Sequence, residues 1–186
     1  MNTLLRSLAI VAALAAAVTL VAPQPAAAAT AAELTRDAQK ALNSLYAKNP
    51  GAKAIGKDAV AVLVFPSVLK AGLGIGGQYG EGVLFRGGKA VAYYNTAGAS
   101  MGMQAGAQTY GYAMFFLSEA TLKSLDTAEG FEVGVGPSVV VADKGMASSP
   151  KTTTTMKDKI YAFIFDQAGA MYALGIQGNK ITKIKK

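Results

Sequence analysis

Glycines recur at strand-like spacing in two stretches, and this pattern constrains the fold more than any other feature of the chain. The glycines that share one face of an extended chain are Gly72, Gly74 and Gly76 in residues 65–82, and Gly98, Gly102 and Gly106 in residues 93–106. Strands normally avoid glycine, because it costs backbone entropy on folding and offers no packing surface. Its repetition on one face predicts sharply curved strands, or a place where another backbone or an acyl chain lies close.

The clearest helical signal begins near residue 30. Thr30 and Glu33 have the spacing of a capping box, and apolar residues then recur at helical spacing. The helix should stop at 49–51, where the sequence is Asn-Pro-Gly. We therefore expect an amphipathic helix over 31–46, with a short second helical turn at 52–57.

From residue 59 onward the pattern is mostly that of β-structure. Residues 59–65 are apolar on both faces, which is typical of a buried central strand. Residues 83–94 indicate a hairpin with a two-residue turn at Gly87-Gly88, and residues 100–117 indicate one or two long strands with glycine bends.

The last third of the chain predicts shorter elements. Residues 118–126 indicate a short helix capped by Ser118, and residues 131–142 a strand pair or one bent strand. A polar loop should occupy 143–159. Residues 160–184 indicate a three-strand meander, with turns at 167–169 and at 178–179.

These elements predict an α+β fold, in which the N-terminal amphipathic helix packs on a curved, glycine-rich antiparallel β-sheet or partly closed barrel. A length of 186 residues favours one domain, which we place at 30–186. The content of hydrophobic residues, 52%, with only 16% charged, is enough for one substantial core.

The first 29 residues have the pattern of a secretory signal peptide. Arg6 gives a basic start, residues 8–21 form an apolar run interrupted only by Thr19, and Ala27-Ala28-Ala29 supplies small residues at the expected cleavage position. A retained membrane anchor is the alternative, although the run is short for a spanning helix. We expect a secreted or periplasmic protein.

The chain contains no cysteine and no histidine. Without cysteine it has no disulfide, no thiolate ligand and no site for the lipid of a lipoprotein. Without histidine it lacks the usual general base and the commonest metal ligand. We therefore predict no catalytic residue, no metal site, no cofactor and no enzymatic activity.

Two short motifs match the residue spacing of nucleotide-binding or catalytic patterns. Residues 72–77 fit G-x-G-x-x-G, but the glycines that follow make the required helix improbable. Residues 98–102 fit G-x-S-x-G, but a nucleophile elbow needs a histidine partner. Paired carboxylates could also catalyse glycoside hydrolysis. Among the carboxylates only Glu81 lies in a glycine-rich segment, and we interpret it as an exposed turn residue.

Basic residues give the chain a formal charge of +7, which loss of Arg6 with the leader lowers to +6. This excess favours an anionic partner, and for a secreted protein lipid headgroups or envelope polymers are better candidates than nucleic acid. Ordinary solubility charge is the alternative for any single lysine. The candidate headgroup-binding residues are Lys53, Lys57, Lys70, Arg86, Lys89, Lys180 and Lys183.

The apolar stripe of the first helix allows two interpretations. Its residues either fill the core against the sheet, which its few basic residues favour, or lie in a membrane interface. The candidate membrane-facing residues are Leu34, Leu42, Leu45 and Tyr46.

The two glycine-rich stretches, together with Phe116-Leu117, 133–145 and 160–181, resemble the SYLF domain family. The resemblance spans about 31–184. That family includes eukaryotic lipid-binding proteins of actin patches and membrane ruffles, and many secreted bacterial relatives. The resemblance implies lipid binding, with anionic phospholipid as the expected partner; the actin binding of some relatives is not expected here. The alternative is an envelope interaction protein that binds a protein or polymer and no lipid.

Overall fold

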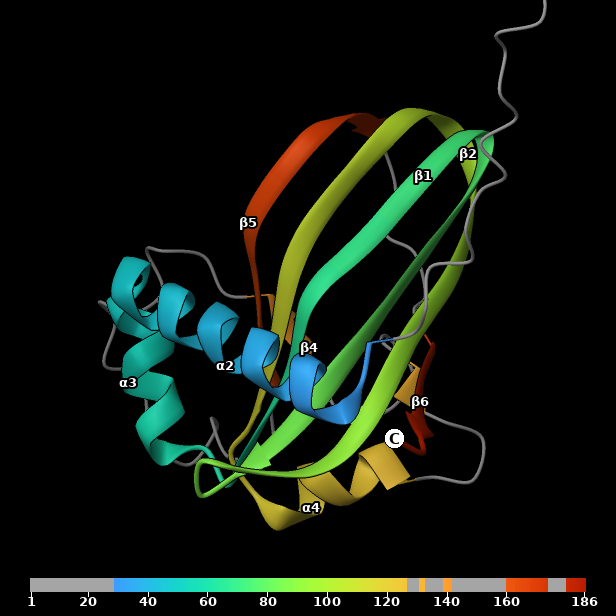
Figure 1. Cartoon of the computed structure of the whole chain (residues 1–186). Helices are drawn as coiled ribbons and strands as arrows, with labels where there is room; N and C mark the ends of the chain where they lie inside the picture. Colours follow the sequence, from blue (N-terminus) through green and yellow to red (C-terminus); the bar gives the residue numbers. More distant parts are fainter. Residues whose placement is uncertain (1–28, 127–130, 133–138, 142–159, 174–179) are drawn as a thin grey trace, which may run out of the picture.

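The computed structural model describes residues 29–126, 131–132, 139–141, 160–173 and 180–186. In this part of the chain, helices pack on a curved sheet in the predicted α+β arrangement (Figure 1). The helices are α2 (Ala31–Lys48), α3 (Pro50–Asp58) and α4 (Glu119–Lys123), with a 3₁₀ turn at Ser124–Asp126. The strands are β1 (Ala61–Arg86), β2 (Lys89–Phe116), β3 (Phe131–Glu132), β4 (Val139–Val141), β5 (Ile160–Ala173) and β6 (Lys180–Ile184).

The helical prediction is confirmed at both ends of α2. The Thr30 side chain accepts a hydrogen bond from the backbone of Glu33, whose carboxylate accepts one in return from the backbone of Thr30. Asn49 ends α2 and caps α3, because its side-chain oxygen accepts from the backbone of Ala52 at 3.0 Å. Pro50 then occupies the first turn of α3, where a missing N–H costs nothing.

The long strand β2 organises the sheet. On one side it pairs with β1 along almost its whole length, through the predicted two-residue turn at Gly87-Gly88. On its other side it pairs with β6 near its start and with β5 near its end. The short strand β3 pairs with β6, and β4 pairs with β5 in parallel. Among the described residues the six strands do not close into a barrel.

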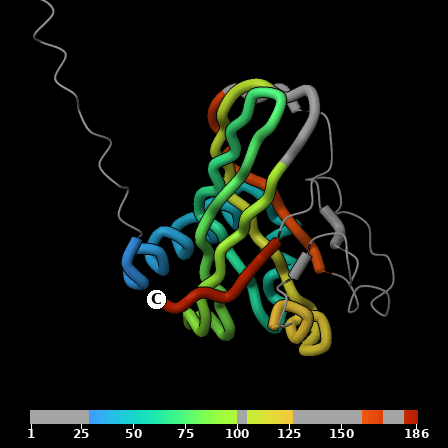
Figure 2. The backbone as a smooth tube through the Cα atoms, turned by 90° about the vertical axis from the view of Figure 1, so that its right-hand side faces the viewer, coloured from blue at the N-terminus to red at the C-terminus, as the bar shows by residue number. Residues whose placement is uncertain are grey.

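The β1–β2 hairpin folds back on itself. Strand β1 bends at Gly74, which has a positive φ of 69° and interrupts the pairing register between Leu73 and Ile75. The hairpin therefore has two ends, and Figure 2 shows it curling over at the upper one. We call residues 67–80 of β1 with residues 96–109 of β2 the tip. The opposite end, called the base, holds the start of β1 and the Gly87-Gly88 turn.

Close backbone contacts explain part of the glycine pattern. A Cβ atom built on Gly82 would lie 2.8 Å from the carbonyl oxygen of Val64, and one on Gly80 would lie 2.8 Å from that of Ser67. The two halves of β1 thus cross in direct contact, with no room for a side chain between them. The positive φ at Gly74 confirms the predicted sharp curvature, whereas these close approaches of another backbone occur at Gly80 and Gly82, which the sequence prediction did not single out.

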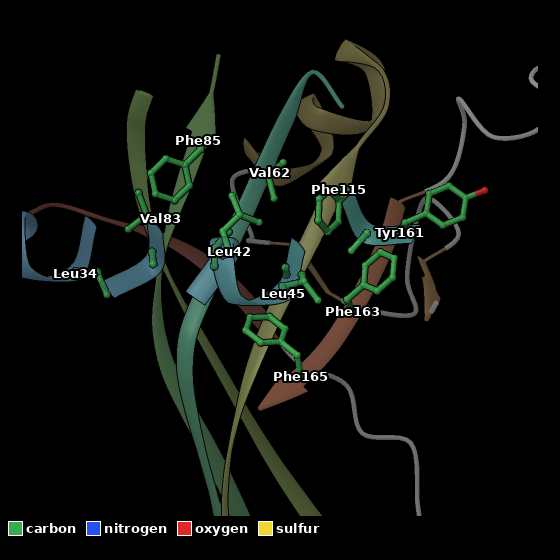
Figure 3. Packing of buried hydrophobic residues seen from close by; sticks show 14 residues of the cluster. Leu34, Leu42, Leu45, Val62, Val83, Phe85, Phe115, Tyr161, Phe163 and Phe165 are labelled. Atoms are coloured by element: carbon green, nitrogen blue, oxygen red, sulfur yellow. The ribbon is translucent and has the colours of Figure 1, made fainter. Parts of the chain in front are cut away.

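Two buried clusters occupy the two faces of the sheet. One lies under α2, where Leu42 and Leu45 pack against Val62, Phe115 and Phe163 (Figure 3). The other lies on the opposite face. Its largest buried side chains include Leu63, Phe65, Tyr94, Met114, Phe116, Leu125, Ile160 and Ile181. The alternation of Val62 and Val64 with Leu63 and Phe65 between these clusters confirms that the strand starting β1 is buried on both faces.

The predicted meander of residues 160–184 is wrong. Residues 160–173 form one strand, in which positive φ angles at Asp166 and Gly169 bend the chain without turning it. Strands β5 and β6 are not neighbours, because each pairs with a different part of β2. The predicted helix at 118–126 is confirmed as α4 and the 3₁₀ turn, with Ser118 as its cap. The predicted loop at 143–159 and turn at 178–179 lie outside the described residues.

Candidate functional site

Four large apolar side chains are exposed around the bend of β1. The exposed fraction is 53% for Leu69, 84% for Leu73, 70% for Ile75 and 51% for Tyr79. Isolated exposed apolar residues are common, but a contiguous group on one element marks a binding surface. The tip is therefore the candidate site.

These residues continue a face of the sheet that α2 covers nearer the base. Side chains alternate along a strand, so Ile75 and Tyr79 share a face with Val83. Val83 is fully buried in the cluster under α2. Toward the tip no described helix covers the same face, and there Ile75 and Tyr79 are exposed (Figure 1). The helix thus shields one half of an apolar surface and leaves the other half open.

An open pocket of about 530 Å³ lies on this surface. It is lined by Leu69, Ala71, Gly77, Gln78, Tyr79, Ala97, Gly98 and Ala99. The residues come from both halves of β1 and from β2, so the fold-back of the hairpin creates the pocket. Its lining is mostly small and apolar, and its volume falls in the range of small-ligand sites, about 300–1,000 Å³.

Charge is almost absent from the tip. Residues 67–80 and 96–109 contain a single charged side chain, Lys70, which is half-buried. The nearest carboxylate along β1 toward the base is that of Glu81. The tip therefore combines exposed apolar surface with one positive charge and no negative one.

An ion pair between Lys186 and Glu81 lies where the tip ends on β1. Lys186 lies 2.7 Å from Glu81 between Nζ and Oε2, and the two side chains are only 10% and 17% exposed. Lys186 also donates to the backbone carbonyl of Ala29 at 2.6 Å, and the Tyr79 hydroxyl donates to Glu81 at 3.2 Å. Burial, with the charge of Glu81 nearby, raises the pKa of Tyr79. The interpretation of Glu81 as an exposed turn residue is wrong: it lies within a strand and is largely buried.

The predicted headgroup-binding residues do not form one cluster. Lys53 and Lys57 lie on α3, which ends just before β1 begins. Arg86 and Lys89 flank the hairpin turn at the base, and Arg86 forms an ion pair with Glu119. Lys70 belongs to the tip itself, and Lys180 lies beside it, opposite Ala97.

The remaining two predicted basic residues lie on β6. Lys183 pairs with Asp126 at 3.1 Å, and Lys180 is exposed opposite Ala97. Asp126 also accepts a hydrogen bond from the buried Tyr94 hydroxyl at 2.9 Å. Burial raises the pKa of Asp126, but its bonds to Lys183 and Tyr94 outweigh burial and leave that pKa below its usual value. This group of side chains ties β6 to the turn that follows α4.

The predicted membrane-facing residues of α2 have the packed arrangement in this structure. Leu34, Leu42 and Leu45 are buried against the sheet (Figure 3), and Tyr46 is half-buried beside Phe115 with ring centroids 6.2 Å apart. Burial raises the pKa of the Tyr46 hydroxyl. These side chains reach a membrane only if α2 leaves the sheet.

Neither the G-x-G-x-x-G nor the G-x-S-x-G motif has the structural context that its chemistry needs. Residues 72–77 and 98–102 both lie inside long strands, with no helix opening after them. Among the described residues, no group of three or more potential metal ligands lies together. Nor does any described helix have the length and apolarity to cross a bilayer.

Sequence reasoning missed the residues that define the site: Leu69, Leu73, Ile75 and Tyr79. A signal was present, since apolar residues alternate with glycine through a stretch with one charge. Such a stretch is equally typical of a buried strand. No protein-family model matches the chain, and no curated protein is similar to it.

Proposed function

We propose that this chain is a non-enzymatic lipid-binding protein that binds lipid with its tip. The observation that carries the proposal is the group of four exposed apolar side chains around an open apolar pocket. The resemblance to the SYLF family, noted from the sequence, points to the same class of ligand. The signal peptide predicted at 1–29 adds the expectation that the protein works in the periplasm or outside the cell.

The exposed apolar surface supplies part of the affinity for lipid. Complete burial of a Leu, Ile or aromatic side chain is worth about 2 kcal/mol, so the exposed fractions of these four supply on the order of 5 kcal/mol before the costs of association. Those costs are subtracted from this sum, so the apolar contacts alone give weak, reversible binding. Basic residues then add a preference for anionic membranes.

Vesicle flotation tests the proposal. We expect the mature protein to float with vesicles containing phosphatidylglycerol, and replacement of Leu73 and Ile75 by asparagine to reduce the bound fraction at least tenfold. Val91→Asn is the matched control, because Val91 is 55% exposed but lies near the base. Absence of flotation with neutral and with anionic vesicles at low salt would sink the proposal.

A protein ligand is the second candidate function. Strand β5 pairs with β4 only through residues 160–162, so among the described residues its outer edge from 163 onward has no partner strand. Such an edge accepts an extended peptide as an added strand. Crosslinking in intact cells separates the candidates: one reproducible protein partner, with no lipid co-purifying, favours the protein ligand.

A further inference from the structure

We infer that the tip docks into one leaflet of an anionic bilayer, with Leu73 and Ile75 below the headgroups and Lys70 at the level of the lipid phosphates. This inference rests on the proposed lipid binding and specifies how the tip engages lipid. It commits to a membrane surface and not to a single lipid carried in the pocket.

The order of residues along β1 matches the layers of a leaflet. The bend at Gly74 is the outermost part of the tip. Its neighbours Leu73 and Ile75 are the most exposed large apolar residues among those described. Apolar groups of peripheral proteins enter about 5–10 Å into the boundary between headgroups and acyl chains. Leu73 and Ile75 adjoin the bend, so they enter first.

Lys70 lies at the right height for a phosphate contact. Strands rise about 3.3 Å per residue, which puts Lys70 about 13 Å from the bend. With the bend about 5–10 Å below the boundary between headgroups and acyl chains, Lys70 lies about 3–8 Å above that boundary, among the headgroups. Because the tip contains no carboxylate, no repulsion from anionic lipid opposes this contact.

The depth of docking has an upper limit in the structure. Glu81 is seven residues from the bend, about 23 Å, and half of a bilayer with its headgroups measures about 20–22 Å. The Glu81–Lys186 ion pair therefore stays at or above the membrane surface. In the described tip β1 pairs only with β2, so its other edge has open backbone groups, which require hydrated headgroups around them. Docking is therefore shallow.

Single-cysteine labelling tests this geometry, because the chain has no cysteine of its own. Ile75→Cys and Leu73→Cys carry an environment-sensitive nitrobenzoxadiazole probe, and Lys89→Cys at the base is the control. With phosphatidylglycerol vesicles we expect emission to rise severalfold at 75 and 73, with stronger quenching by a shallow acyl-chain nitroxide than by an aqueous quencher. The probe at 89 should not respond.

A charge test is independent of the probes. Lys70→Gln should weaken binding to anionic vesicles about fivefold and leave binding to neutral vesicles unchanged, whereas Lys89→Gln should change neither. Equal effects of the two substitutions would overturn the role of Lys70.

The outcomes separate the two proposals. If the protein does not float, lipid binding itself fails. If it floats while the probes at 73 and 75 stay in water, leaflet docking is refuted and lipid binding stands. Probes that are already shielded without vesicles, in protein that co-purifies with a lipid, would show a carried ligand in the pocket and equally overturn leaflet docking.

Discussion

Replacing Gly82 by alanine tests whether glycine is required where the two halves of β1 cross. The new Cβ would lie 2.8 Å from the carbonyl oxygen of Val64 and 2.6 Å from the ring of Phe65. The ring can rotate away, but the carbonyl belongs to a paired strand and moves only with it. Gly82 does not have a positive φ, so steric contact is the cause of the expected effect.

The size of the effect follows from overpacking. Inserting a methyl group into a close-packed contact costs about 1–3 kcal/mol, and we expect about 2 kcal/mol for Gly82→Ala. For a domain of this size each kcal/mol lowers the melting temperature by about 2–4 °C, so the expected decrease is about 4–8 °C.

Gly77→Ala is the matched control for a thermal unfolding series. Gly77 lies on the same strand, but an added Cβ would approach nothing closer than the Gly98 carbonyl oxygen, at 3.5 Å. We expect no loss there, and a gain of up to about 0.5 kcal/mol because alanine costs less backbone entropy. Equal melting temperatures for Gly82→Ala and Gly77→Ala would refute the argument that the crossing excludes a side chain.

Two further predictions concern charged side chains. Lys186→Met should lower the free energy of unfolding by about 2 kcal/mol, measured by urea denaturation, because it leaves the largely buried Glu81 without its partner. Lys185→Met, at the neighbouring exposed lysine, should change nothing, and equal effects of the two substitutions would refute the role of the ion pair. The hydrogen bond from Lys48 lowers the pKa of Asp166, so this pair contributes stability above the unfolded-state pKa of about 4, and the contribution is lost as the pH falls through the lower folded-state value. Since the chain has no histidine, we expect melting temperatures to be flat between about pH 6 and 9, and a transition near pH 6.5 would contradict this.

Local signals were sufficient to predict the elements that depend on a few neighbouring residues. The capping box of Thr30 and Glu33 places the start of α2, and Gly87-Gly88 places the hairpin turn, because both rest on backbone geometry within four residues. The meander failed for the opposite reason. The partner of β5 is chosen by long-range packing against β2, and no local pattern in residues 160–184 encodes that choice.

The candidate site could be predicted only in its composition. The sequence shows that residues 67–80 are apolar and nearly uncharged, but burial depends on what covers them. Val64 and Leu69 belong to the same strand and have similar side chains, yet Val64 is fully buried and Leu69 is half exposed. The difference arises because α2 covers the sheet near the base and does not reach the tip (Figure 1).

Basic residues at the base and apolar residues at the tip play different parts in membrane binding. Arg86 and Lys89 lie at the base, and twelve residues of strand, about 40 Å, separate the start of β1 from Leu73. That distance is several times the Debye length of about 8 Å at physiological ionic strength, so a membrane docked at the tip is screened from the base. The net positive charge therefore favours approach to an anionic surface, whereas the tip and Lys70 supply the bound-state contacts. Bound protein should accordingly lose only about the contribution of the two lysines at the tip, Lys70 and Lys180, when salt is raised, and a steep salt dependence would place the membrane at the base instead.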